Sequence, residues 1–368
     1  MSATTLPRIR FGRTGWDVTR LGIGTIPLIN EPERASEVTL NRALDRGINF
    51  VDTAEQYKNM QERVGKFISH RRSEFVLTSK TYSRTSKDAR RSLENALVAM
   101  KTDFIDGYML HSVSSMASWE EIQAKGACLD VFQKAREQGL IGHVGISIHR
   151  DLRVMRLAIE SGLFDFVMLA YSPLDQENVA AEILPLAKRH DVGVMLMKAM
   201  AGGQLIPEPT DMSPDEADQL KRSAIRFCLS NPNVHAAVIG MNTVEQVDFN
   251  VAAACATLPI PDEATDRMRR LIAKISRDFR YGQMCLRCYY CQPCPEGVPI
   301  PEIFRAGDAL AGYPDELKSL ADEMYAKLDF RTEMCVECGE CMENCPAGID
   351  IPKRLREVAA AFDARRTG

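Results

Sequence analysis

Short apolar runs alternate with longer amphipathic segments between about residues 20 and 255. The apolar runs have the length and the β-branched content of buried strands, and they cover 21–24, 49–53, 75–80, 105–111, 143–148, 166–172, 193–198 and 236–240. The segments between them, such as 86–101 and 215–231, repeat their apolar residues with the period of a helix. Eight strand–helix units in about 235 residues match a closed (β/α)8 TIM barrel in number and length. The sequence therefore predicts an α/β barrel.

An open, doubly wound sheet also alternates strands with helices. Such a sheet normally carries the phosphate-binding loop G-x-G-x-x-G after its first strand. Only the fragment Gly22-Ile23-Gly24 is present, and small residues inside a barrel strand explain it equally well. Ahead of the first strand, residues 8–21 predict a hairpin that turns at Thr14-Gly15 and caps the bottom of the barrel.

The pattern becomes helical beyond the barrel. Helices are expected at 261–276, 301–311, 315–328 and 352–362. Of the eleven cysteines, only Cys128, Cys228 and Cys255 precede residue 285, and each falls in a helical segment where a buried thiol is an ordinary core residue. We therefore expect two domains, a barrel over 1–278 and a small α-helical domain over 279–368.

Charge and hydropathy exclude several classes of partner. The chain has 46 Lys and Arg against 50 Asp and Glu, a net charge of −4, and no block of like charge, so no nucleic-acid partner is expected. No apolar run approaches the roughly 18 residues of a membrane-spanning helix. The start, MSATTLPRIR, lacks the apolar centre of a signal peptide. The expectation is a cytoplasmic protein without a membrane partner.

Four polar residues stand at the ends of three neighbouring strands, where barrels of this kind carry their chemistry. Asp52 ends the second strand and Tyr57 follows it, Lys80 ends the third, and His111 ends the fourth. An ammonium within about 4–6 Å of a tyrosine lowers the phenol pKa. A carboxylate beside the lysine keeps it charged, and a histidine can hold a carbonyl oxygen by a hydrogen bond. Together such groups would protonate an oxygen as hydride reaches the attached carbon.

Each of the four residues also has an ordinary structural interpretation. Asp52 could be a cap, Tyr57 a rim aromatic, Lys80 a surface lysine and His111 a satisfied core histidine. Their coincidence at three successive strand ends favours an active site.

These residues lie within a longer pattern: RFGRTGWDVTRLGIGT, FVDTAEQY, LTSK, LHS, GHVGIS, YSPL and VIGMNTVEQVDFNVAA. Over about residues 8–258 the sequence resembles the aldo-keto reductases. The resemblance implies that the barrel binds NAD(P) across its strand ends and acts on a small carbonyl or alcohol, with Tyr57 as proton donor assisted by Asp52, Lys80 and His111. It further implies a cofactor site formed by Gly24, Thr25, Asp52, Ser147, Met168, Met197, Lys198, Gly240, Met241, Asn242, Glu245 and Asn250.

Several positions depart from the family pattern. Ile148 stands where the family usually has Asn, Met168 where it has Gln, and Met197 where an aromatic residue stacks on the nicotinamide. Losing two amide contacts would weaken or redirect nicotinamide binding by roughly a few kcal/mol. Residues 241–243 hold no arginine for a 2′-phosphate, so no preference for NADP over NAD is predicted.

The remaining eight cysteines form two runs. The first is Cys285-x2-Cys288-x2-Cys291-x2-Cys294-Pro295 and the second is Cys335-x2-Cys338-x2-Cys341-x3-Cys345-Pro346. The second run has the spacing of bacterial ferredoxins, in which the fourth cysteine ligates the other cluster. By that analogy one [4Fe–4S] cluster takes Cys285, Cys288, Cys291 and Cys345, and the other takes Cys335, Cys338, Cys341 and Cys294. Structural zinc is the alternative, but it favours two separated C-x2-C pairs.

The whole chain thus resembles the aldo-keto reductases that carry a C-terminal, ferredoxin-like [4Fe–4S] domain, here expected over 279–368 with two clusters. The first hypothesis is an NAD(P)-dependent oxidoreductase that interconverts a carbonyl and an alcohol. The alternative is an electron-transfer oxidoreductase whose clusters exchange electrons with a ferredoxin-type partner or with the barrel-bound substrate. A non-catalytic cofactor sensor is a third hypothesis, which the intact set of four residues opposes. Hydride carries two electrons whereas a [4Fe–4S] cluster takes one at a time, so coupling the two normally needs a flavin, and no convincing flavin-specific pattern is evident.

Overall fold

The computed structural model describes residues 5–149, 151–173, 179–201, 205, 213–256, 258–275, 285, 290–312, 318–328, 330–345 and 349–367. The chain divides into two compact units, one formed by residues 1–200 with 221–265 and the other by 201–220 with 266–368. The predicted domain boundary at 278/279 lies outside the described residues.

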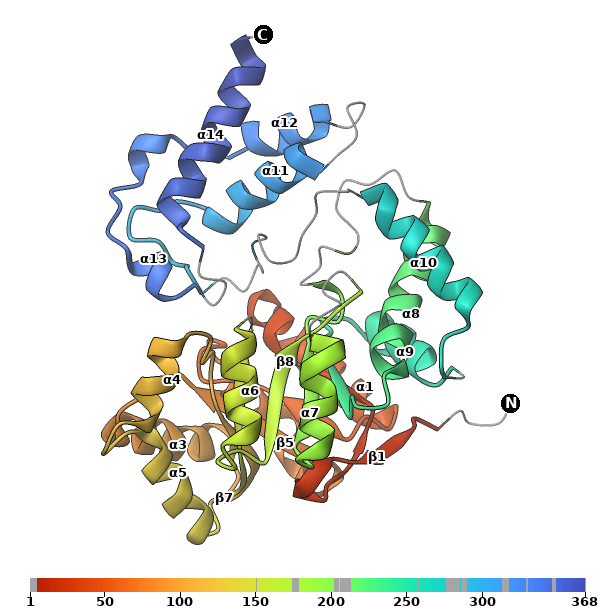
Figure 1. Cartoon of the computed structure of the whole chain (residues 1–368), viewed down its shortest axis with the longest axis vertical. Helices are drawn as coiled ribbons and strands as arrows, with labels where there is room; N and C mark the ends of the chain where they lie inside the picture. The colour runs from red at the N-terminus through yellow and green to blue at the C-terminus, as the bar shows by residue number, and fades with distance from the viewer. Residues whose placement is uncertain are drawn as a thin grey trace. The chain divides into compact units, whose positions relative to one another are not determined.

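The first unit is a closed barrel of eight parallel strands (Figure 1). Around the barrel the strands follow one another in chain order, and the last pairs with the first. They are β3 (Leu21–Gly24), β4 (Phe50–Asp52), β5 (Val76–Thr81), β6 (Ile105–Leu110), β7 (Ile141–Ile148), β8 (Phe166–Ala170), β9 (Gly193–Met197) and β10 (Ala236–Gly240). The predicted α/β barrel is confirmed.

Several strand ends differ from the sequence prediction. β5 continues one residue past Lys80, and β6 stops one residue before His111. β9 ends at Met197 instead of including Lys198, because Lys198 has a left-handed backbone with φ +63° that no strand accommodates.

Helices follow the strands on the outside of the barrel, and Figure 1 shows α6 and α7 beside β8. They are α1 (Glu33–Asp45), α2 (Met60–Phe67), α3 (Ser86–Met100), α4 (Met116–Gln123), α5 (Cys128–Glu137), α6 (Leu152–Glu160), α7 (Leu184–Arg189) and α9 (Val244–Ala254), whereas α8 (Pro214–Ser230) and α10 (Asp262–Ile275) each include residues of both compact units. Cys128 and Cys228 are fully buried in this layer, as their helical positions predict.

The base of the barrel is closed by a short hairpin. β1 (Arg8–Arg10) pairs antiparallel with β2 (Asp17–Thr19), and Phe11 from this hairpin packs among the interior side chains of the strands. The neighbouring strands leave room for it: a Cβ on Gly193 would lie 2.4 Å from the Phe11 ring. The predicted capping hairpin is therefore confirmed, and it fixes the opposite, carboxyl end of the strands as the open mouth.

The second unit is helical. α11 (Ile300–Gly312) packs against α12 (Lys318–Ala326) and α14 (Ile351–Thr367), as Figure 1 shows, and the short α13 (Glu340–Glu343) lies in the second cysteine run. Its core includes Phe304, Leu355 and Phe362, and the Phe362 ring stacks on Tyr325 with a centroid distance of 4.1 Å. Among the described residues of the whole chain, no helix has the length and apolar character to span a bilayer.

Candidate active site and cysteine cluster

The four predicted catalytic residues come together at the carboxyl ends of β4, β5 and β6. Asp52 is the last residue of β4, and Tyr57 lies in the loop that follows. Lys80 is the penultimate residue of β5, and His111 comes directly after β6. All four side chains are buried, with exposed fractions of 7% or less.

Lys80 lies between the other members of the group. Its Nζ donates to Asp52 Oδ2 at 2.6 Å and to the Thr53 carbonyl at 2.7 Å, and it lies 5.0 Å from the centre of the Tyr57 ring. Thr78 Oγ1 donates to the other oxygen of Asp52 at 2.8 Å. Burial lowers the pKa of Lys80 and raises that of Asp52, and their direct contact opposes both shifts. Asp52 therefore holds the lysine beside the tyrosine.

His111 is packed between two tyrosines. Its ring stacks on Tyr82 with a centroid distance of 4.5 Å and meets the Tyr57 ring edge to face at 6.1 Å. Burial lowers the pKa of His111 well below its ordinary value, and the cations Lys80, Arg84 and Lys198 lower it further. The imidazole is consequently neutral near pH 7.

Residues that the sequence did not single out complete this group. Gln56 Oε1 lies 3.0 Å from His111 Nδ1, and Arg84 donates to the His111 carbonyl at 2.6 Å. Gln56 directly precedes Tyr57, and this neighbourhood is the only feature of the sequence that could have pointed to Gln56. For Tyr82 the corresponding feature is its position directly after β5.

Further polar groups end the neighbouring strands. Thr25, after β3, donates to Thr53 Oγ1 at 3.0 Å. Ser147, near the end of β7, accepts from the Ser112 backbone at 2.8 Å. Lys198 Nζ lies 2.8 Å from Nδ1 of the buried His149, a histidine for which no role was predicted. These predicted cofactor residues thus lie at the same end of the barrel as Tyr57.

The end of β10 leads into the N-terminus of α9. Gly24 and Gly240 are paired between β3 and β10, and a Cβ on Gly240 would lie 2.5 Å from Pro27 Cγ. Thr243 caps α9 by accepting from the Gln246 backbone, and Asn242 donates to Glu31 Oε1 at 2.8 Å. A helix N-terminus at this position favours a bound anion.

The other predicted cofactor residues here differ in exposure. Met241 and Asn250 are buried, whereas Glu245 is exposed in the first turn of α9.

The residues that depart from the family pattern are all apolar. Ile148 is fully buried, and Met168 belongs to the interior cluster that includes Phe11 and Met109. Met197 packs against the same cluster. Met168 thus stands in place of the family's amide and Met197 in place of its aromatic ring, and both methionines contribute apolar packing.

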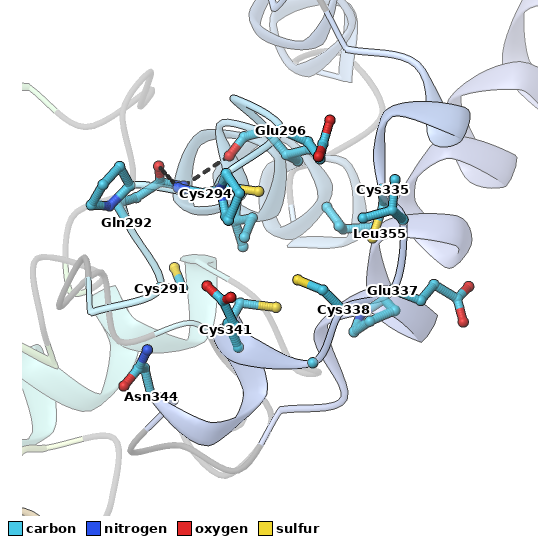
Figure 2. A pocket seen from close by; sticks show the side chains of 18 of the residues that line it. Cys291, Gln292, Cys294, Glu296, Cys335, Glu337, Cys338, Cys341, Asn344 and Leu355 are labelled. Atoms are coloured by element: carbon cyan, nitrogen blue, oxygen red, sulfur yellow. Dashed lines mark hydrogen bonds between the residues drawn. The ribbon is translucent and has the colours of Figure 1, made fainter.

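Cysteines from both runs line one pocket in the second unit, with a volume of about 160 Å³. Cys291 and Cys294 come from the first run, and Cys335, Cys338 and Cys341 from the second. Figure 2 shows their sulfur atoms around a common space, with Cys338 and Cys341 turned toward each other.

The electrostatic environment links the fourth cysteine of the first run to the second run. Burial raises the pKa of Cys341 to about 11 and also raises that of Cys335. For both thiols, Cys294 and Cys338 raise the pKa further. Cys294 therefore lies within electrostatic reach of the second run, as crossed ligation requires.

The other predicted ligands are less completely described. Cys285 and Cys345 are half-buried against the core of this unit, and Cys288 lies outside the described residues. A ring of soft thiol donors around a cavity suits an iron–sulfur cluster, whose binding must displace the thiol protons.

A parallel barrel with Asp, Tyr, Lys and His at its mouth, joined to a cysteine-rich helical unit, defines an oxidoreductase with an iron–sulfur domain. Residues 20–223 match the model of the aldo/keto reductase family, and residues 284–351 match that of the 4Fe-4S dicluster domain. The chain therefore belongs to the aldo/keto reductase family and carries a C-terminal 4Fe–4S domain.

Known relatives match about two thirds of the chain. The uncharacterized oxidoreductase YqkF of Bacillus subtilis is 24% identical over 285 residues, which cover 67% of this chain and 90% of that protein. L-galactose dehydrogenase of Arabidopsis thaliana is 25% identical over 278 residues, covering 66% and 86%. The aldo-keto reductase AKR11C1 of Bacillus halodurans, in its holo form, shares the fold with a TM-score of 0.61 at 24% identity, covering 72% and 96%.

Proposed function

We propose that the protein interconverts a carbonyl and an alcohol on a small molecule, using a nicotinamide cofactor and Tyr57 as the general acid or base. The observation that carries this proposal is the position of Lys80, 2.6 Å from Asp52 and 5.0 Å from the centre of the Tyr57 ring. A buried lysine held at this place tunes the phenol hydroxyl for proton exchange.

The strand ends fit a nicotinamide cofactor. The N-terminus of α9 would hold a phosphate. Gly240, Met241 and Asn242 lead into this helix, and Glu245 and Asn250 lie within the helix. On the other strands Gly24, Thr25, Asp52, Ser147, Met168, Met197 and Lys198 would line the rest of the cofactor. When bound, the nicotinamide supplies or accepts the hydride. Residues 241–246 include no lysine or arginine, so both NAD and NADP belong in the test.

The chain's own residues handle the proton. During reduction Tyr57 donates its hydroxyl proton to the substrate oxygen, and during oxidation it takes the proton back. Lys80 stabilises the phenolate that remains after donation, and Asp52 orients Lys80. His111, neutral and fixed between Tyr57 and Tyr82, orients the substrate.

The second unit would hold two [4Fe–4S] clusters. One would take Cys335, Cys338, Cys341 and Cys294, whose proximity the shared pocket supports, and the other Cys285, Cys288, Cys291 and Cys345. Cys338 is exposed, which favours electron exchange at the surface as a second candidate function, with a ferredoxin-type protein as partner.

Replacing Tyr57 with Phe tests the first function. In the anaerobically purified chain we expect the Tyr57→Phe variant to lose about 10²–10⁴-fold in turnover, measured as NAD(P)-linked oxidation of L-galactose and reduction of glyceraldehyde. Cofactor binding should be unchanged, because Tyr57 is not among the residues proposed to hold it. The control is Tyr325→Phe, the same change in the second unit, which should leave turnover intact.

The same variant separates the two candidate functions. Unchanged turnover in Tyr57→Phe would remove the tyrosine from the mechanism. Absence of NAD(P)-linked turnover in the wild-type chain, together with clusters that accept electrons from reduced ferredoxin, would favour the electron-transfer function instead.

A further inference from the structure

Cys294, the fourth cysteine of the first run, stands in a short loop ahead of α11. Its carbonyl accepts from the Gly297 backbone at 2.9 Å, which closes a turn. Gly297 has a left-handed backbone with φ +68°, a conformation that glycine adopts without a steric penalty. Val298 and Ile300, which follow, are buried in the core of the second unit. The end of the loop is therefore anchored in that core.

The side chain of Gln292 bridges this loop. Gln292 Oε1 accepts from the Cys294 backbone N–H at 3.2 Å, and Gln292 Nε2 donates to the Val298 carbonyl at 2.8 Å (Figure 2). An N–H only donates and a carbonyl oxygen only accepts, so the two bonds fix which way the amide faces. Gln292 thus links the backbone of Cys294 to a residue of the buried core.

The composition of the pocket makes the direction of Cys294 important. Cysteines at five positions line it, whereas a [4Fe–4S] cluster takes four thiolates. Cys291 and Cys294 are separated by only two residues, one of which is Gln292. A contact that fixes the backbone of Cys294 therefore helps to determine which of these two neighbouring thiols faces the second run.

We infer that Gln292 is a positioning residue that holds Cys294 as the fourth thiol for the three pocket cysteines of the second run. The inference rests on the proposed function, in which the second unit holds two [4Fe–4S] clusters. Without the bridge, the Cys294 backbone loses its fixed direction and one iron loses its thiolate. The [4Fe–4S]²⁺ cluster then releases Fe²⁺ and leaves [3Fe–4S]⁰, which added ferricyanide oxidises by one electron to [3Fe–4S]⁺.

A Gln292→Met variant tests the bridge, because it keeps the size of the side chain and removes both hydrogen bonds. In the anaerobically purified full chain, a chelator should take up iron about tenfold faster from this variant than from the wild type. After ferricyanide oxidation, the EPR signal of [3Fe–4S]⁺ should be stronger than in the wild type. Unchanged iron release and an unchanged EPR spectrum would overturn the inference.

Asn344→Leu is the matched control. Asn344 carries the other side-chain amide that lines the pocket, but it is exposed, and its side chain forms no hydrogen bond to the residues that the structure describes. Its loss should leave iron release and the EPR spectrum as in the wild type, and an effect as large as that of Gln292→Met would contradict the inference. Gln292→Glu keeps an oxygen acceptor for the Cys294 N–H and should release iron more slowly than Gln292→Met. Equal rates in these two variants would contradict the role of the acceptor.

Cys294→Ala separates an effect through Cys294 from a general loosening of the unit. It should give the same [3Fe–4S]⁺ signal as Gln292→Met, and the double variant should release iron no faster than Cys294→Ala alone, because both changes remove the same ligand. Faster release from the double variant would show that Gln292 acts by another route and would overturn the inference. A Cys294→Ala variant with intact clusters would contradict the ligand set of the proposed function and the inference with it. An altered Cys294→Ala beside an unaltered Gln292→Met would overturn the inference alone.

Discussion

The two candidate sites differ in what holds them in place. At the barrel mouth, Asp52, Lys80 and His111 have exposed fractions of 3% or less and are fixed by hydrogen bonds to protein groups such as Thr78 and Thr53. In the second unit the described cysteines are half-buried except for Cys338, which is exposed. The barrel thus organises its candidate catalytic groups through its own packing, whereas we expect the thiols to acquire their order from a bound cluster.

Removing the iron should produce the largest difference between the two units. Chelation of iron from the anaerobic protein should unfold or loosen the cysteine unit, because its small core around Phe304 and Phe362 would lose the cross-links between the two cysteine runs. Hydrogen exchange measured by mass spectrometry should show rapid exchange in α11 and α14 but unchanged protection in the barrel strands.

The control is a variant that loses a thiol outside the two runs. Cys128→Ala should retain iron and protection of α11 and α14. If α11 and α14 of the wild type keep the same protection after iron is removed, the apolar core alone holds the cysteine unit together. The proposed difference between the two units would then be wrong.

The Asp52–Lys80 pair tests the claim that the barrel site is held by its own packing. Lys80→Met leaves the buried Asp52 carboxylate without its cation, which should lower the free energy of unfolding by about 3–5 kcal/mol. Turnover should fall by about 10²–10⁴-fold because Tyr57 loses its neighbour. Urea unfolding followed by tryptophan fluorescence reports on the barrel, since both tryptophans, Trp16 and Trp119, lie in the barrel unit.

The double variant Asp52→Asn/Lys80→Met separates stability from activity. Because it removes the unpaired charge, it should recover part of the lost stability while remaining as inactive as Lys80→Met. Equal instability in the single and double variants would show that the buried charge is not the cause.

Much of the barrel could be predicted from the sequence because its signals are local. Each buried strand is a short apolar run, and each catalytic candidate stands within a few residues of a strand end, so a parallel barrel brings Asp52, Lys80 and His111 to one mouth without any knowledge of side-chain packing. The analogy with bacterial ferredoxins likewise predicts that Cys294 joins the second run, and Cys294 raises the pKa of Cys335 and Cys341.

What escaped prediction depends on side-chain directions. The stacking of Tyr82 on His111 and the contact of Gln56 with His111 Nδ1 join residues from different strand ends through particular rotamers. The left-handed backbone of Lys198 ends β9 one residue early, and the apolar run 193–198 gives no sign of it. The sequence therefore indicates which residues stand near the strand ends but not which side chains contact one another there.

Titration of His235 should have the smallest effect on stability among these predictions, and it tests the base of the barrel rather than its mouth. Its Nδ1 accepts from the Val194 backbone at 3.1 Å, and its ring packs 5.3 Å from Phe11. Burial lowers its pKa from 6.5 to about 4, a shift that Arg20 and Arg10 increase and Asp191 opposes. Below pH 6.5 the unfolded chain takes up a proton that the folded barrel excludes. Stability should therefore fall as the pH drops from 6.5 to 4 and level off below that.

The size of this effect is bounded by the pKa difference. The loss attributable to His235 should amount to at most roughly 3 kcal/mol. His235→Asn keeps an acceptor for the Val194 amide but does not titrate, so its urea stability between pH 7 and pH 4.5 should decline less steeply than that of the wild type. His70→Asn, at an exposed position, should follow the wild-type curve. Parallel curves for wild type and His235→Asn would show that the barrel base does not exclude the proton.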